Sequence, residues 1–165
     1  MIRILSLSAG PQVQLSKNFR VEEFKCKDGS DLVLVADELI QRLQALREVL
    51  GKPVNINSAY RTVSHNHKIG GHKRSAHLAG LAADIKVAGL DPAEVAKAAE
   101  IMGFRGIGLY KDFVHVASRR SFWDKRSGKA VYVQTFGGKS PANADYKALY
   151  EAAQKKLEQI RKIVA

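Results

Sequence analysis

Two histidines and one aspartate stand out as residues whose types and order could bind a metal ion. His77 and Asp84 lie in the run Ser75-Ala-His-Leu-Ala-Gly-Leu-Ala-Ala-Asp84, and His115 lies in the run Asp112-Phe-Val-His-Val. Two imidazole nitrogens and one carboxylate oxygen form a ligand set that suits a divalent zinc ion. Three protein ligands leave the fourth tetrahedral position open to water, as in catalytic zinc sites. The pattern therefore predicts a catalytic zinc centre.

Two strands and a turn are needed to bring these side chains together. The apolar segment Leu81–Val87 predicts a strand that carries Asp84, and Phe113–Val116 predicts a second strand with His115 in its middle. Gly80 allows the chain to turn between the first histidine and the first strand. Because neighbouring strands lie about 4.8 Å apart, His115 can sit beside Asp84. A carboxylate among alanine and isoleucine is costly to bury without a cation, which favours a bound metal.

The sequence around these positions resembles the zinc D-alanyl-D-alanine carboxypeptidase and L-alanyl-D-glutamate peptidase family, which includes phage endolysins. The members cleave peptidoglycan, and their fold is shared with the hedgehog signalling domain. The resemblance covers roughly residues 16 to 120. Five blocks carry it in the right order: Asn18–Gly29, Asn57–Thr62, His65-Asn66 with Gly70-Gly71, Ser75–Asp84, and Gly106–Tyr110 leading into His115.

The resemblance implies that His77, Asp84 and His115 bind zinc and that Asp112 is the general base. General chemistry agrees with this role for Asp112, because a carboxylate near an activated water can take its proton and pass it to the leaving amine. If Asp112 were a fourth ligand, it would close the site and make it structural. A plain turn residue after Lys111 is the alternative interpretation of Asp112.

The resemblance further implies a substrate-binding motif at Ser58-Ala-Tyr60-Arg61. Arg61, together with Ser75, would hold the peptide through a carboxylate or the scissile carbonyl, because a guanidinium offers a planar fork of donors. Ser58 and Tyr60 complete this predicted substrate-binding set. The competing interpretation is that Arg61 pairs with a surface acid, although no Asp or Glu occurs between Glu48 and Asp84.

Two features of the sequence keep other interpretations open. The family often carries an acid two residues beyond the last histidine, where this chain has Ala117, and loss of such an anchor can weaken metal affinity or activity ten- to a hundred-fold. This departure favours a non-catalytic wall-binding or phage structural module as the alternative function. His65 and His67 form an alternative ligand pair, but that pair would leave Asp84 unexplained.

The charge of the chain bears on its partners. The 165 residues carry a net charge of +11, and the stretch between Glu48 and Asp84 contains no acid. Its basic residues predict a positive rim that attracts anionic wall substrates: Lys52, Arg61, Lys68, Lys73 and Arg74. The basic residues are scattered and no nucleic-acid-binding signature is present, so the expected partner is the peptidoglycan stem peptide and not a specific nucleic acid. The sequence favours neither the D-alanyl-D-alanine nor the L-alanyl-D-glutamate bond.

The N-terminal residues and the single cysteine predict where the protein is made. The first ten residues lack the apolar core and cleavage site of a secretory signal, and no stretch is long enough to cross a bilayer. Cys26 alone excludes an internal disulfide framework. We therefore expect a monomer made in the cytoplasm that reaches the wall through phage release or in a virion, with leaderless bacterial export as the alternative.

The remaining patterns predict an α+β fold with helices packed on a small, mainly antiparallel sheet. The leucine spacing predicts a helix over 37–50, and Asp91 with Pro92 predicts a second helix that ends near Met102. Further strands are expected over 52–56, 106–110 and 113–116. We expect a peptidase domain over 1–120 and an extension over 121–165, with a strand near 130–136 and an amphipathic helix over 144–164 that docks on the same domain.

Overall fold

A six-stranded sheet forms the centre of the computed structural model, which describes residues 1–10 and 12–133. The strand order is β10-β9-β7-β8-β6-β5. Only the pair β7 and β9 is parallel, so the sheet is mainly antiparallel, as predicted. The strands are β5 (Val54–Ser58), β6 (Ala82–Val87), β7 (Gly106–Leu109), β8 (Val114–Ala117), β9 (Ser121–Asp124) and β10 (Val131–Tyr132).

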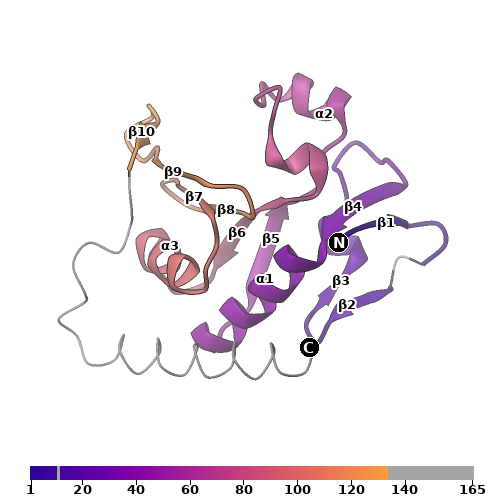
Figure 1. The fold of residues 1–165 in the computed structure, drawn as a ribbon, viewed down its shortest axis with the longest axis horizontal. Coiled ribbons are helices and arrows are strands. Elements are labelled where there is room, and N and C mark those ends of the chain that lie inside the picture. Colours follow the sequence, from indigo (N-terminus) through magenta and orange to yellow (C-terminus); the bar gives the residue numbers. More distant parts are fainter. Residues whose placement is uncertain (11, 134–165) are drawn as a thin grey trace.

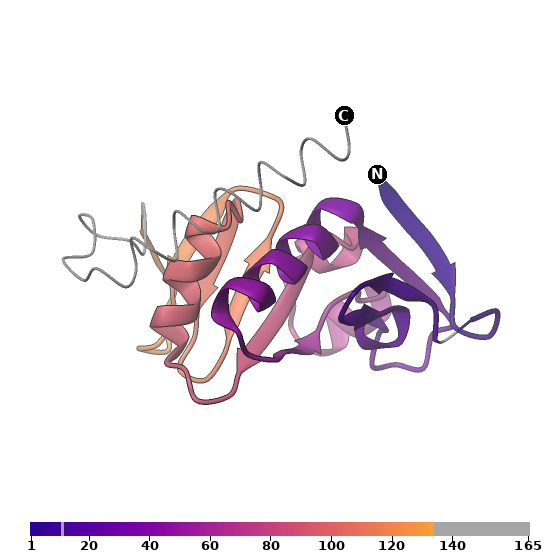
Figure 2. The same ribbon diagram turned by 90° about the horizontal axis from the view of Figure 1, so that it is seen from below.

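Helices cover the two sides of this sheet unequally. Figure 1 shows α1 (Asp37–Leu50) and α3 (Pro92–Ile101) on one side and the short helix α2 (Val63–Lys68) on the other. Figure 2, seen from below, shows the two longer helices lying across the near face of the sheet. The other elements are the strand pairs β1 (Ile2–Ser6) with β4 (Leu32–Ala36) and β2 (Gln14–Ser16) with β3 (Phe19–Arg20), and the 3₁₀ helices η1 (Val21–Phe24) and η2 (Ala76–Ala79).

Both predicted helices are confirmed, because their ends are encoded locally. Helix α1 buries Leu39, Leu43 and Leu46 and stops at Gly51, whose positive φ of 60° ends the helix in a left-handed turn. Helix α3 begins with a capping box in which the Asp91 side chain accepts a backbone hydrogen bond from the first turn. No described helix has the length and apolar character needed to span a membrane.

Several elements were not predicted from the sequence. The missed strands include β1 and β4, which pair across a long separation in the chain, and β9, whose four residues hold Trp123. Because β9 and β10 extend the central sheet, part of the predicted C-terminal extension pairs with the strands before it. The division at residue 120 stays a prediction, and the predicted helix over 144–164 lies outside the described residues.

The sheet has an apolar face and a polar face. Ile85, Ile107 and Val114 point toward the core under α1 and α3, with exposed fractions of 0 to 1%. The residues between them point to the opposite side, since side chains alternate along a strand. One row across five strands then consists of directly paired residues on this polar face, which we call the cross-strand row: Ser58, Asp84, His115, Gly108 and Trp123.

Gly80 fixes the turn that precedes β6, and its replacement should destabilise the fold. Its φ is 66°, and a Cβ there would overlap the backbone carbonyl of Leu34, while its own carbonyl accepts a hydrogen bond from Ala36. We expect Gly80→Ala to lower the free energy of unfolding by about 3 kcal/mol, through left-handed strain and backbone overlap. Urea unfolding of the metal-free protein measures this change.

Gly103→Ala is the matched control for this prediction. Gly103 has a φ of 77°, but a Cβ there meets nothing within 4 Å. We expect this variant to lose only about 1 kcal/mol, the cost of the left-handed conformation alone. Equal losses in the two variants would show that the close approach of Gly80 to β4 contributes nothing.

Candidate metal centre

Asp84 and His115 are placed by strand pairing. They are direct neighbours in the antiparallel pair β6 and β8, and both point to the polar face of the sheet. His115 Nδ1 lies 2.9 Å from Asp84 Oδ1, and both residues are buried. The predicted convergence of two strand residues is therefore present in the structure.

His77 reaches the same point from η2, above the sheet. The Ser75 hydroxyl accepts the backbone N–H of His77 at 3.4 Å and so caps this short helix, which ends at Gly80. The imidazole of His77 is only 2% exposed. Its Nε2 lies 3.1 Å from His115 Nδ1 and 3.3 Å from Asp84 Oδ1. One residue of η2 thus completes a group of three converging ligand atoms.

The separations between these three atoms fit a tetrahedral metal site. Bonds of about 2.0 to 2.1 Å at tetrahedral angles put neighbouring ligand atoms roughly 3.3 Å apart. The observed separations are 2.9, 3.1 and 3.3 Å. In the described part of the chain this is the one group of three or more metal-binding side chains that comes together, so neither His65 nor His67 joins it.

The protonation of His77 is set by the backbone. Its Nδ1 lies 2.6 Å from the carbonyl oxygen of Ala59, and because a carbonyl can only accept, Nδ1 carries the hydrogen. In the neutral ring, Nε2 then presents a lone pair to Asp84 and His115. Histidine ligands of metals are oriented in this way by a partner on the other ring nitrogen. With two acceptors facing it, His115 Nδ1 holds the shared hydrogen, whose place a metal ion would take.

Electrostatics keep the carboxylate ionised and the second imidazole neutral. Burial by itself would raise the pKa of Asp84, but the hydrogen bond from His115 is the largest effect that opposes it, and this pKa lies well below its usual range. Burial lowers the pKa of His115, and the hydrogen bond with Asp84 offsets this only in part. Metal binding needs an ionised carboxylate and a neutral imidazole, which are the forms favoured here.

Arg61 contacts the metal-binding carboxylate itself. Its Nη2 donates to Asp84 Oδ2 at 2.5 Å, and its Nε donates to Ser58 Oγ at 2.9 Å. The Arg61 and Asp84 side chains are 14% and 12% exposed. The partner of Arg61 is thus a ligand residue, a pairing that was not part of the sequence prediction. Ser58 is close to the centre as the partner of Arg61 and as the neighbour of Asp84 in the cross-strand row.

Tyr60 and Asp112 lie outside the group of three ligands. Tyr60 is buried in the hydrophobic core, with its backbone N–H bonded to the carbonyl of Phe24. Asp112 is 68% exposed in the turn between β7 and β8, where Lys86 Nζ donates to its Oδ2 at 2.9 Å. That hydrogen bond holds the pKa of Asp112 below its ordinary value. Lys86 follows Asp84 by two residues, so its side chain leaves β6 on the same face, with its Cα roughly 6.6 Å farther along the strand.

The sequence of this chain matches a known protein family. The profile of the Peptidase M15 family matches residues 16–117 of this chain, a range that contains all three ligand residues. The chain belongs to the M15 peptidase family. The family resemblance predicted from the sequence is therefore confirmed.

Two curated proteins are similar to part of this M15 member. It is 34% identical over 93 residues to the zinc D-Ala-D-Ala carboxypeptidase of Streptomyces albus G, covering 52% of this chain and 36% of the relative. It is 34% identical over 87 residues to the peptidoglycan L,D-endopeptidase MepK of Escherichia coli K12, covering 47% of this chain and 48% of the relative. The chain thus spans less than half the length of either relative.

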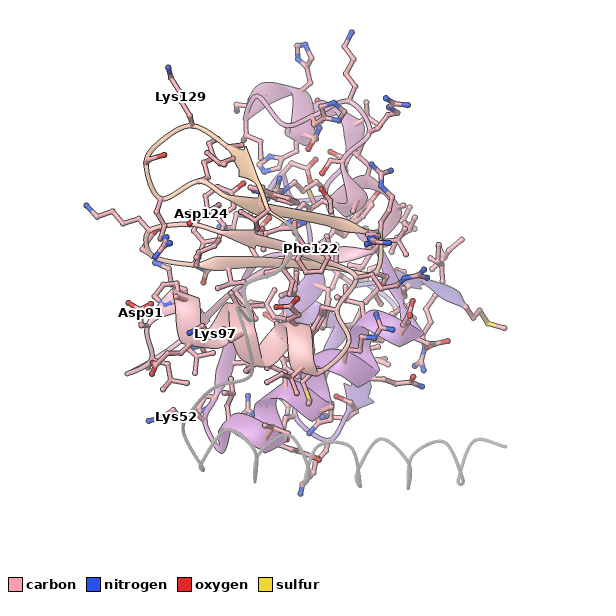
Figure 3. All side chains as sticks on the ribbon, turned by 60° about the vertical axis from the view of Figure 1, so that its left-hand side comes forward. Lys52, Asp91, Lys97, Phe122, Asp124 and Lys129 are labelled. Atoms are coloured by element: carbon pink, nitrogen blue, oxygen red, sulfur yellow. The ribbon has the colours of Figure 1, made fainter. Side chains whose placement is uncertain are left out.

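Two residues of this M15 member, Ala117 and Lys52, differ from expectation. Ala117, at the position where an acid was expected, is 3% exposed and pairs with Ala82 and Gly106 in the sheet, so small side chains fill the space around it. Lys52 is not on the rim of the centre, because it lies near Gly89 at the far end of β5. Figure 3 shows it below Asp91, the residue that caps α3.

Trp123 is the residue of this M15 peptidase centre that sequence reasoning missed. Its indole lies against His115, with ring centroids 5.0 Å apart. It comes after the residues matched by the family and after the last predicted ligand, so no motif indicated it. A single tryptophan in a chain of 165 residues was the only signal available.

Proposed function

We propose that this protein is a zinc-dependent peptidase that hydrolyses amide bonds in peptidoglycan stem peptides. The convergence of His77 Nε2, Asp84 Oδ1 and His115 Nδ1 in an M15 member is the observation that carries this proposal. The names of the two relatives support both the metal and the class of substrate. Zinc, when bound, lowers the pKa of a coordinated water to about 7 and polarises a carbonyl oxygen.

Asp112 is proposed as the general base. Its depressed pKa leaves an ionised carboxylate that can accept a proton from the attacking water at Oδ1, the oxygen not bonded to Lys86. The same oxygen then donates this proton to the leaving nitrogen, as general acid–base catalysis of amide hydrolysis requires. The hydrogen bond from Lys86, which leaves β6 on the same face as Asp84, would hold the Asp112 carboxylate toward that face.

Arg61 is proposed to have two functions. Nε and Nη2 hold Ser58 and Asp84, which leaves the donors on Nη1 for the carboxylate or carbonyl of a peptide. Ser75 supports the site by capping η2, and Tyr60 supports it by fixing the backbone before Arg61 to Phe24. The positive side chains at the end of α2 and after it favour approach of an anionic stem peptide: Lys68, Lys73 and Arg74.

The same proposal includes the type of fold, the bond that is cleaved and the biological role of the cleavage. The mainly antiparallel sheet with its metal ligands on one face is the arrangement expected for the hedgehog and D,D-peptidase fold. Either a D-alanyl-D-alanine bond or an L-alanyl-D-glutamate bond is the predicted target. The phage-lysis role predicted from the sequence is one use of this activity, and it requires that the intact protein lyses cells once a separate pore admits it to the wall.

Digestion of intact peptidoglycan tests the proposed function. We expect the purified protein to release fragments with new free termini, which mass spectrometry assigns to one bond. A chelator should abolish the release and added zinc should restore it, while His77→Ala should be inactive because it loses a ligand. A protein that binds zinc stoichiometrically but releases no fragment would instead be a wall-binding module.

A further inference from the structure

The side chain of Trp123 extends over Gly108 to reach the metal centre. In the cross-strand row, Gly108 stands between His115 on β8 and Trp123 on β9. A Cβ at Gly108 would overlap the indole atoms Cε2 and Cζ2, so the ring lies directly over this glycine. The missing side chain of Gly108 therefore lets a residue two strands away touch His115.

The indole is also fixed by a hydrogen bond of its nitrogen. Trp123 Nε1 donates to the hydroxyl of Tyr110 at 3.4 Å, and the Tyr110 ring stacks on Phe113 with centroids 4.1 Å apart. These aromatic contacts restrain the indole at the nitrogen and on the face over Gly108. A ring held in this way is a rigid surface for a neighbouring side chain.

His115 lies between two rings. The His77 ring lies 4.9 Å from it at 63°, and the Trp123 ring lies 5.0 Å from it at 40°. His77 is held by the Ala59 carbonyl, but the contact of His115 Nδ1 with Asp84 and His77 would be replaced by the metal ion itself. Among the ring contacts that remain when the ion is bound, the indole of Trp123 is the one that comes from outside the ligand group.

We propose that Trp123 is a positioning residue that holds the imidazole of His115 in the orientation that binds the metal. The inference rests on the metal centre of the proposed function. It assigns a role in that centre to β9, which lies outside residues 16–117. A pre-oriented ligand loses less rotational freedom when the ion binds, so the contact should appear as metal affinity.

Zinc affinity, measured by competition with a chromophoric chelator, tests this role. We expect Trp123→Ala to bind zinc about ten-fold more weakly, the loss typical of a residue that orients a ligand. Trp123→Phe, which keeps an aromatic face but not the bond to Tyr110, should fall between the wild type and Trp123→Ala. If Trp123→Ala does not fold, Trp123→Leu keeps apolar volume without an aromatic face and carries the same expectation.

Phe122→Ala is the matched control on the same strand. Phe122 neighbours Trp123 but packs against the hydrophobic core on the other face of the sheet, and Figure 3 labels it beside Asp124 on β9. We expect this variant to lose stability while keeping the zinc affinity of the wild type. A purely structural role of β9 would instead lower the affinity equally in the Phe122 and Trp123 variants, and would overturn the inference.

Gly108→Ala provides an independent route to the same answer. The added methyl group should push the indole off His115 and weaken zinc binding, whereas in the Trp123→Ala background it should cost nothing further. If the losses of zinc affinity in Gly108→Ala and Trp123→Ala simply add in the double variant, the inference is wrong, because the effects of two residues that act through one contact are not additive. If zinc affinity does not change when Trp123 is replaced, the inference is wrong but the proposed function stands. If the wild-type protein binds no zinc, both the inference and the proposed function are wrong.

Discussion

Replacing Asp84 with alanine is expected to abolish zinc binding and also to destabilise the metal-free protein. One carboxylate oxygen faces the two histidines and the other accepts the hydrogen bond from Arg61. Removal of Asp84 takes away a ligand and leaves the guanidinium of Arg61, 14% exposed, without its counter-charge. Losing one partner of a buried ion pair costs about 3 to 5 kcal/mol, so we expect a loss of about 3 kcal/mol in unfolding free energy.

Two measurements separate these effects. Isothermal titration with zinc should show no binding in Asp84→Ala, and urea unfolding in the presence of a chelator should show the lower stability. His115→Ala is the comparison, since it also removes a ligand but leaves the ion pair of Arg61 in place. If both variants lose zinc and have the same metal-free stability, the pair of Arg61 and Asp84 does not stabilise the fold.

Replacing Asp112 with asparagine is expected to remove catalysis and leave the metal centre intact. Asparagine keeps the size of the side chain but cannot accept and return a proton. A positioned general base contributes about 10²- to 10⁴-fold, so we expect kcat for stem-peptide hydrolysis to fall by about 10³-fold. Zinc affinity and stability should stay near wild type, because Asp112 is 68% exposed and is not part of the ligand group.

Single-turnover hydrolysis of a stem-peptide substrate, with zinc content measured on the same samples, tests this prediction. Lys86→Met is the companion variant, because it keeps Asp112 but removes the tether at Oδ2. We expect it to lose less activity than Asp112→Asn. Unchanged turnover in Asp112→Asn would exclude Asp112 as the base, and loss of zinc in that variant would identify it as a ligand.

The sequence predicted the parts of the fold that are encoded by nearby residues. Helix α1 has its leucines at helical spacing and a glycine at its end, and α3 has a proline after a capping aspartate. Strands β6 and β8 are short, mainly apolar runs, with Asp84 in the first and His115 in the second. Because those polar residues were metal-ligand types, the ligand group could be predicted together with the strands.

The rest depends on contacts between distant residues, which periodicity does not reveal. The carbonyl of Ala59 that fixes His77 is a backbone group and leaves no trace in residue types. Arg61 pairs with Asp84 because the fold brings β6 beside the loop after β5. Trp123 acts across Gly108 only because β9 pairs in parallel with β7, a crossover that no local pattern encodes.

Because two of the metal ligands lie in the cross-strand row, metal binding favours the native alignment of the strands as the chain folds. Slipping one strand by a single residue turns its side chains to the opposite face, so a misaligned β6 or β8 would point Asp84 or His115 into the apolar layer. An ion that binds only the correctly aligned sheet adds its binding free energy to that alignment alone. Zinc present during refolding would thus raise the yield of the native alignment over its shifted competitors, by an amount set by the free zinc concentration.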